Sequence, residues 1–166
     1  ILGATGAVGQ EMMNILAERS FPVAELRLLA SKNSAGKVIN GHTVVEACRK
    51  NFEGLDIVLG AAENDIAERF AEDIKAAGAV FIDNSSAFRL CPDVPLVVPE
   101  INPQDVKLHK GIISNPNCTT VISCTAVNAL NAVSPIESMV VSSYQAVSGA
   151  GAAGPTELFG EVEAIA

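Results

Sequence analysis

The sequence predicts an α/β fold built on a mostly parallel, doubly wound sheet. Short apolar runs alternate with segments that carry apolar residues at helical spacing, as in successive strand–helix–strand units. A glycine-rich turn opens the chain between a strand tail and such a helix. Hydrophobic residues make up 49% of the 166 residues and charged residues 18%, which is enough apolar material for a folded core. The length allows one full domain and the start of a second.

The glycine-rich turn consists of Gly3, Gly6 and Gly9, between Ile1-Leu2 and a helix predicted over residues 7–19. This spacing lets the backbone turn tightly and approach a pyrophosphate, while the helix start supplies N–H groups. It predicts a Rossmann-like dinucleotide site. Since the pattern is GxxGxxG rather than GxGxxG, a plain strand–helix turn is the alternative. One face of the helix is expected to be buried, formed by Val8, Met12, Ile15 and Leu16.

The second strand, predicted over residues 25–30, bears on the choice of cofactor. In NAD-binding units an acidic residue usually ends this strand and binds the ribose 2′-hydroxyl, but none stands here. Residues 31–37 instead carry hydroxyls and amines suited to a 2′-phosphate, which favours NADP over NAD. A solvated polar turn is the alternative interpretation.

Further elements complete the predicted topology. They are an antiparallel excursion over 37–46 with an Asn40-Gly41 turn, a strand over 55–60, a helix over 65–77 closed by Gly78, and strands over 79–83, 96–98 and 136–147. We place the domain boundary near Ser134. This gives a dinucleotide-binding domain over 1–133, which carries the helix from Cys118, and the start of a second domain over 134–166.

Polar residues 84–89 follow the predicted strand over 79–83. In open α/β sheets ligands collect outside the carboxyl ends of the strands. Arg89 is therefore a candidate clamp for a carboxylate or a phosphate. An ordinary surface arginine is the competing interpretation.

Cys118 is the candidate nucleophile. Asn115-Pro116 enforces an extended turn, Asn117 is a good N-cap, and the residues from Cys118 to Val133 have helical spacing. A cysteine in the first turn of a helix lies among unpaired N–H groups at the positive end of the helix dipole, which favours the thiolate. The alternative is a small apolar residue packed within a helix.

Composition argues against several classes of function. The formal charge of −8 makes nucleic acid and anionic membranes poor partners, and no apolar run is long enough for a membrane span. The four cysteines have no zinc-ligand spacing, so no metal site is expected, and reduced thiols suit a cytoplasmic protein. Because residue 1 is Ile and the last residues stop within a helical pattern, we expect the chain to be a fragment.

The chain resembles the aspartate-β-semialdehyde dehydrogenase family along its whole length. The resemblance rests on ILGATGAVG, FPVAELRLLASKNSAGK, FIDNSSAFRLCPDVPLVVPEIN, SNPNCTT and SSYQAVSGAGAAG. The N-acetyl-γ-glutamyl-phosphate reductases are the nearest rival family, with the same reaction type and an NPGC-type cysteine turn. They lack the DNSSAFR and YQAVSGAG stretches.

The resemblance implies NADPH-dependent reduction of L-aspartyl 4-phosphate to aspartate 4-semialdehyde and phosphate, a step towards lysine, threonine and methionine. It implies that Cys118 forms a thioester, that Gln145 positions the substrate, and that Arg89 and Asn117 bind at the phosphate. It also implies that residues 134–166 begin the catalytic and dimerisation domain, which is of the α+β type of glyceraldehyde-3-phosphate dehydrogenase. The implied cofactor residues are Gly3, Thr5, Gly6, Ala7, Val8, Ser31, Ser34, Ser148 and Gly149.

Two departures from the family pattern limit these expectations. Asn33 stands where many relatives have an arginine, so NAD stays a second candidate for the cofactor. The family's acid/base histidine and carboxylate-binding arginine have no counterpart here, since neither His42 nor His109 matches. We therefore expect these 166 residues alone to be inactive or slow. The resemblance implies that the full-length chain is a homodimer or homotetramer. A catalytically inactive paralogue is the alternative from a different class of function.

Overall fold

The computed structural model describes residues 1–151 and 153–165. These residues divide into two compact units, Ile1–Pro135 and Ile136–Ala166. The first unit contains the sheet and the helices that pack on it, and the second contains a short 3-10 turn and a helix.

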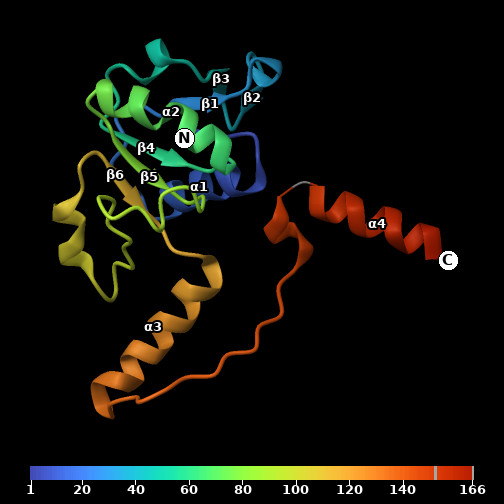
Figure 1. Ribbon diagram of the computed structural model, residues 1–166. Helices are drawn as coiled ribbons and strands as arrows, with labels where there is room; N and C mark the ends of the chain where they lie inside the picture. The colour runs from blue at the N-terminus through green and yellow to red at the C-terminus, as the bar shows by residue number, and fades with distance from the viewer. Residues whose placement is uncertain (152, 166) are drawn as a thin grey trace. The chain divides into compact units, whose positions relative to one another are not determined.

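The sheet of the first unit is a single twisted layer (Figure 1). Its strands are β1 (Leu28–Ala30), β2 (Val38–Ile39), β3 (His42–Glu46), β4 (Ile57–Gly60), β5 (Val80–Asp83) and β6 (Ile112–Ser114). Two three-stranded parts, β1-β3-β2 and β4-β5-β6, are joined through Leu2, which pairs in parallel with both Leu29 and Gly60. Every pairing is parallel except that of β2 with β3.

The order of the strands reverses at Leu2. From there the chain moves outward to β1 and β3 on one side, then returns to build β4, β5 and β6 on the other. This is the Rossmann order, and a crevice for ligands opens where such an order reverses. The predicted doubly wound fold is confirmed.

The helices are α1 (Ala7–Glu18), α2 (Asn64–Ala76), α3 (Cys118–Val133) and α4 (Ala153–Ile165). Short 3-10 turns lie at η1 (Lys32–Ser34), η2 (Arg49–Phe52), η3 (Pro103–Leu108) and η4 (Val147–Ala150). Among the residues described, no helix combines the length and the apolar character that crossing a membrane requires.

The core forms two clusters because successive strand residues point to opposite faces of the sheet. On β1, Leu29 belongs to a cluster with Phe52, Phe70 and Phe81, which includes the buried face of α2. Leu28 and Ala30 belong to the other cluster, which includes Met13 of α1. The two helices therefore cover the two faces of the sheet.

The predicted buried face of α1 is partly wrong. Val8 is 55% exposed and Ile15 39% exposed, whereas Gly9 and Met13 are buried. A Cβ on Gly9 would lie 2.5 Å from the Gly3 carbonyl oxygen and 2.7 Å from the Ala4 Cα. The backbone approaches so closely at this point that the helix turns the face with Gly9 and Met13 towards the sheet.

Two predicted strands are absent. Residues 96–98 make only an isolated bridge, from Leu96 to Ser114. The next bridge of a parallel ladder would need the N–H groups of residues 99 and 116, and both are proline. The Asn102 side chain binds the backbone groups that point away from β6: its Nδ2 donates to the Leu96 carbonyl at 2.9 Å and its Oδ1 accepts from the Val98 N–H at 2.8 Å. Residues 136–146 are extended without strand pairing, since no described strand lies alongside them, and η4 starts at Val147.

The predictions for the hairpin between β2 and β3 and for α3 are confirmed. Asn40 and Gly41 both have positive φ, 49° and 80°, as a two-residue turn between β2 and β3 requires. The helix α3 has the predicted bounds, and the Asn117 side chain accepts a hydrogen bond from the Thr119 N–H at 3.0 Å. Pro116 in front of this cap is buried.

Replacing Gly9 with alanine tests the contact between α1 and the sheet. The new Cβ would overlap main-chain atoms of Gly3 and Ala4, which cannot move aside as a flexible side chain can. We expect the Gly9→Ala variant to lose about 2 kcal/mol of unfolding free energy in a urea titration. At Gly6 the same Cβ would meet only the Gly3 oxygen, at 3.5 Å, so Gly6→Ala should cost less than about 1 kcal/mol. Equal losses in the two variants would contradict this account.

Removing the cap of α3 should loosen its first turn. In the Asn117→Ala variant the Thr119 N–H loses its acceptor, and we expect a loss of about 1 kcal/mol with faster hydrogen exchange at that amide. Asn117→Ser is the matched control because serine keeps a capping oxygen. Unchanged exchange at Thr119 in the alanine variant would show that the cap does not hold this turn.

Candidate active site

The candidate site lies along one edge of the sheet in the first unit. Because all strands but β2 run parallel, their carboxyl ends meet there, and polar or glycine-containing segments follow several of them. These segments are the turn from Gly3, the loop from Ser31, residues 61–64, residues 84–89, and the turn at 115–118. Sequence reasoning had assigned ligand contacts to four of these five.

The glycine turn has the geometry of a phosphate-binding loop. Gly3 has φ +84°, and a Cβ there would lie 2.5 Å from the Ala61 carbonyl oxygen, so only glycine allows this turn to pack beside the end of β4. Gly6 is the N-cap residue of α1 and provides no side-chain cap. The first-turn N–H groups of α1, from Ala7 to Gly9, are therefore available to an anion.

Thr5 and Val8 border the same turn. The Thr5 carbonyl accepts a hydrogen bond from the Gln10 side chain at 3.1 Å, which ties the turn to the first helical residues. Val8, far from packing in the core, is 55% exposed. An exposed valine in the first turn of α1 is available to contact a ligand bound at the helix start.

The loop from Ser31 begins where β1 ends, beside the glycine turn. The N–H groups of Gly3 and Ala4 both donate to the Leu29 carbonyl, at 2.8 and 3.2 Å, which links the two segments. The loop is closed by the Ser34 N–H, which donates to the Ser31 carbonyl at 2.9 Å. Ser31 is exposed and Ser34 half-buried, so hydroxyl groups border the glycine turn on the side of β1.

Cys118 is the first residue of α3 and is exposed. Its neighbour Asn117 holds the helix start through the cap to Thr119, at 3.0 Å. The thiol thus stands at a helix N-terminus that follows directly from the end of β6. Its thiol is exposed in this structure, as α3 has no buried residue.

Arg89 is a half-buried side chain with two backbone partners. Its Nε donates to the Asn115 carbonyl at 3.0 Å, and its terminal NH2 donates to the Asn84 carbonyl at 2.8 Å. The guanidinium has five N–H donors, so those two bonds leave donors for an anion. Arg89 is therefore no ordinary surface arginine, and it lies next to the turn that carries Cys118.

Sequence reasoning missed the polar groups at the ends of β5 and β6. Asp83 is fully buried, and its carboxylate accepts from the Ser85 N–H at 3.1 Å and the Ser85 hydroxyl at 2.6 Å. Asn115 donates its side-chain amide to the Asn84 side-chain oxygen. The signal for these contacts was a polar pair at the end of each of two adjacent strands, Asp83-Asn84 and Ser114-Asn115.

The second unit brings Gln145, Ser148 and Gly149 together. Ser148 and Gly149 lie in η4, and Gln145 precedes it. A Cβ on Gly149 would lie 1.8 Å from the Gln145 Nε2, so the amide of Gln145 lies directly against the glycine backbone. The residues predicted at the active site and cofactor site in this region are thus adjacent within their own unit.

Metal binding has no support in the described part of the chain, where no group of three or more His, Cys, Asp and Glu side chains is placed to hold an ion. His42 is exposed in β3, and the Nδ1 of His109 accepts from the Gly111 N–H at 3.0 Å. Cys48, Cys91 and Cys124 are free thiols, as is Cys118.

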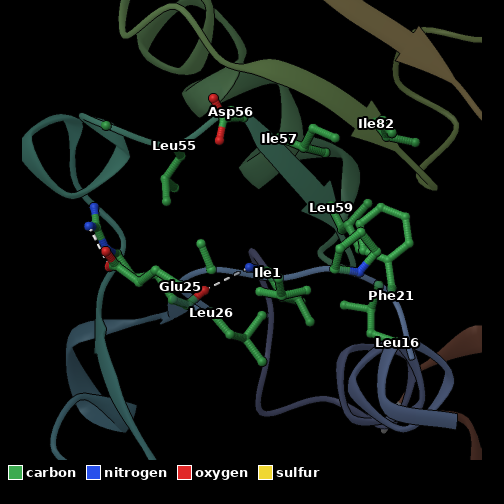
Figure 2. Close-up of a pocket in the computed structure, with 15 residues that line it drawn as sticks. Ile1, Leu16, Phe21, Glu25, Leu26, Leu55, Asp56, Ile57, Leu59 and Ile82 are labelled. Atoms are coloured by element: carbon green, nitrogen blue, oxygen red, sulfur yellow. Dashed lines mark hydrogen bonds and ion pairs between the residues drawn. The ribbon is translucent and has the colours of Figure 1, made fainter. Parts of the chain in front are cut away.

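A cavity of about 520 Å³ lies at the opposite, amino end of the strands (Figure 2). Figure 2 shows Ile1, Phe21, Ile57 and Leu59 among its largely apolar lining. The Ile1 nitrogen donates to the Arg27 carbonyl at 2.8 Å. No residue predicted at the candidate site lines this cavity.

The comparisons with known proteins agree with this geometry. Residues 1–109 match the model of the family "Semialdehyde dehydrogenase, NAD binding domain". The aspartate-semialdehyde dehydrogenase of Synechocystis sp. is 53% identical over 156 residues, which cover 92% of this chain and 46% of that protein. The chain spans about half the length of the curated relatives it matches.

Solved structures show the same likeness. The aspartate semialdehyde dehydrogenase II of Vibrio cholerae complexed with ASA superposes with a TM-score of 0.86 at 43% identity, over 96% of this chain and 49% of that one. The enzyme of Candida albicans with NADP gives 0.64 at 29% identity, over 81% and 46%. The resemblance inferred from the sequence is confirmed, and the chain belongs to the semialdehyde dehydrogenase family.

Proposed function

We propose that this chain supplies the cofactor-binding part and the nucleophile of an NADPH-dependent aspartate-semialdehyde dehydrogenase. The reaction is the reductive dephosphorylation of L-aspartyl 4-phosphate to L-aspartate 4-semialdehyde, in the synthesis of lysine, threonine and methionine. The observation that carries this proposal is the exposed Cys118 at the start of α3, on the same sheet edge as the open glycine turn. The ASA named with the Vibrio cholerae relative is consistent with it.

The first half of the reaction uses Cys118. Its thiolate attacks the acyl carbon of the aspartyl phosphate, so a C–S bond forms, and the C–O bond to phosphate then breaks. Main-chain N–H groups in the first turn of α3 can stabilise the oxyanion of the tetrahedral intermediate. The donors of Arg89 that are not bonded to the Asn84 and Asn115 carbonyls suit the departing phosphate.

The second half reduces the thioester. NADPH, when bound, supplies a hydride. The protein holds the acyl group on Cys118 close enough to the cofactor to receive it. The C–S bond then breaks, which returns the electron pair to sulfur and frees the aldehyde. We assign Gln145 to positioning the substrate and Asn117 to the phosphate end of the site.

The cofactor site fits a dinucleotide at the glycine turn. The uncapped N-terminus of α1 and the open position of Gly6 leave room and donors for a pyrophosphate. The hydroxyls of Ser31 and Ser34 at the end of β1 favour NADP, in keeping with the NADP named with the Candida albicans relative. Asn33 supplies no positive charge, so NAD stays the competing cofactor.

We also propose how the chain is divided and where it works. Residues 1–133 form the dinucleotide-binding domain, and 134–166 begin the catalytic and dimerisation domain. Within the latter, Ser148 and Gly149 make further contacts to the cofactor. The natural polypeptide is a cytoplasmic homodimer or homotetramer whose partners are small-molecule substrates.

Replacing the nucleophile tests the proposed function. In the natural polypeptide that carries these residues, Cys118→Ser should lower phosphate-dependent reduction of NADP by aspartate semialdehyde at least about 1,000-fold, because the hydroxyl is a far weaker nucleophile than a thiolate. Cys91→Ser is the matched control and should retain activity, since Cys91 only approaches the Ala87 carbonyl, at 3.9 Å. The 166 residues alone should show little or no turnover.

Other outcomes of this assay contradict the proposal. Activity with the N-acetylglutamate analogue and none with aspartate semialdehyde would assign the protein to the N-acetyl-γ-glutamyl-phosphate reductases. An absence of activity with both aldehydes would indicate an inactive paralogue. An active Cys118→Ser variant would exclude the thioester mechanism.

Removing the two hydroxyls of the loop after β1 tests the cofactor. We expect the Ser31→Ala/Ser34→Ala variant to bind NADP about tenfold more weakly while its affinity for NAD is unchanged, because only NADP carries the 2′-phosphate that accepts from them. Titration calorimetry measures both dissociation constants. The control is Thr43→Ala, which removes an exposed hydroxyl at the other end of the neighbouring strand β3. Equal weakening for NAD and NADP would show that the loop does not select the 2′-phosphate.

A further inference from the structure

The carboxyl ends of β4, β5 and β6 are connected by a continuous row of polar contacts. In register, Gly60 of β4 lies beside Asp83 of β5, and Asp83 lies beside Ser114 of β6. The next residues along β5 and β6 are Asn84 and Asn115. Both are half-buried, so water competes only partly with the contacts that they make.

The side chain of Asn84 connects β5 to β4. Its Nδ2 donates to the Gly60 carbonyl at 2.8 Å, and its own backbone N–H donates to the same oxygen at 3.3 Å. This leaves the Asn84 Oδ1 directed to the other side, where it accepts from the Nδ2 of Asn115. One amide thus bridges the ends of two strands and receives a bond from the third.

Asn115 is held from several directions. Its backbone N–H donates to the Asp83 carbonyl at 2.8 Å, and its carbonyl accepts from the Arg89 Nε at 3.0 Å. Arg89 also donates to the Asn84 carbonyl at 2.8 Å, so the guanidinium binds the main chain of both asparagines. The amide pair and Arg89 therefore determine where the chain leaves β6.

Asn115, at the end of this row of contacts, lies only a few residues before Cys118 in the chain. Asn115 is followed by the buried Pro116, whose ring restricts the backbone, then by the capping Asn117 and by Cys118. Few free torsions separate the amide of Asn115 from the start of α3. A shift of Asn115 is therefore transmitted to Cys118 and is not absorbed by a flexible loop.

We propose that Asn84 and Asn115 form a pair of positioning residues whose mutual hydrogen bond, braced by Arg89, sets the place of Cys118. The inference rests on the proposed function in one respect, that Cys118 is the nucleophile. The inference predicts that the two amides act as a unit, because the loss of either one removes their mutual hydrogen bond and leaves the end of β6 unsupported. A misplacement of about 1 Å can cost about 100-fold in rate.

The first test does not depend on activity. The rate at which iodoacetamide alkylates Cys118 at neutral pH is measured by peptide mass spectrometry, with Cys91 in the same molecules as an internal control. In Asn115→Ala and Asn84→Ala we expect this rate to fall about tenfold, because the thiol leaves its place at the start of α3. Asn51→Ala is the matched control: its amide donates to the Glu46 carbonyl of β3 at 2.8 Å, which takes no part in the contacts of Asn84 and Asn115.

The second test is a double-mutant cycle on kcat. Each single variant should lower kcat by about 10- to 100-fold with the KM for NADP within about twofold, and the double variant should be no slower than the slower single variant. Multiplied effects would overturn the pair, as would single variants with kcat within twofold of the parent. Asn115→Asp, which keeps the shape but loses the donor, serves if Asn115→Ala does not fold, and activity and alkylation like the parent's would overturn the proposal.

These experiments distinguish a failure of the proposed function from a failure of the positioning inference. An active Cys118→Ser variant overturns the proposed function, whereas the alkylation rate still decides whether the asparagines place the thiol. An inactive Cys118→Ser variant together with unchanged alkylation rates and unchanged kcat in the asparagine variants overturns only the positioning inference.

Discussion

The short parallel pairing of Leu2 with two neighbours holds the first unit together. The Leu2 N–H donates to the Leu59 carbonyl at 2.9 Å, and the Leu2 carbonyl accepts from the Ala61 N–H at 2.8 Å. On the other side the Leu29 N–H donates to the Ile1 carbonyl at 2.8 Å. Without these bonds the sheet would be two separate three-stranded parts, and the crevice at the reversal of strand order would not exist.

The glycine turn follows from this central position. A chain that leaves the middle of a parallel sheet has to turn between the ends of its neighbours, and Gly3 does so against the Ala61 carbonyl. Gly9 then lets α1 lie close to the turn, which points the helix N-terminus at the same edge. The packing of the sheet and the exposure of anion-binding N–H groups thus have one structural cause.

At the carboxyl ends of β4, β5 and β6, the edge of the sheet is held by hydrogen bonds of polar side chains. There Asn84, Asn115 and Arg89 join strand ends that the sheet ladder has already brought into register. Half-buried polar groups of this kind are costly when unpaired, so each bond in the row favours one arrangement of the exit from β6. The start of α3 inherits that arrangement through Pro116 and the cap at Asn117.

The sequence by itself determined the features that depend on local chemistry: the glycine turn, the Asn40-Gly41 hairpin and the start of α3 at Cys118. Positive φ, proline and an N-cap restrict the backbone whatever lies around it. Only the tertiary structure decided which face of α1 is buried, since the close approach at Gly9 outweighs the apolar pattern. It also decided that residues 136–146 form no strand and that Asn84 meets Asn115, because strand pairing and side-chain contacts depend on which distant segments lie alongside.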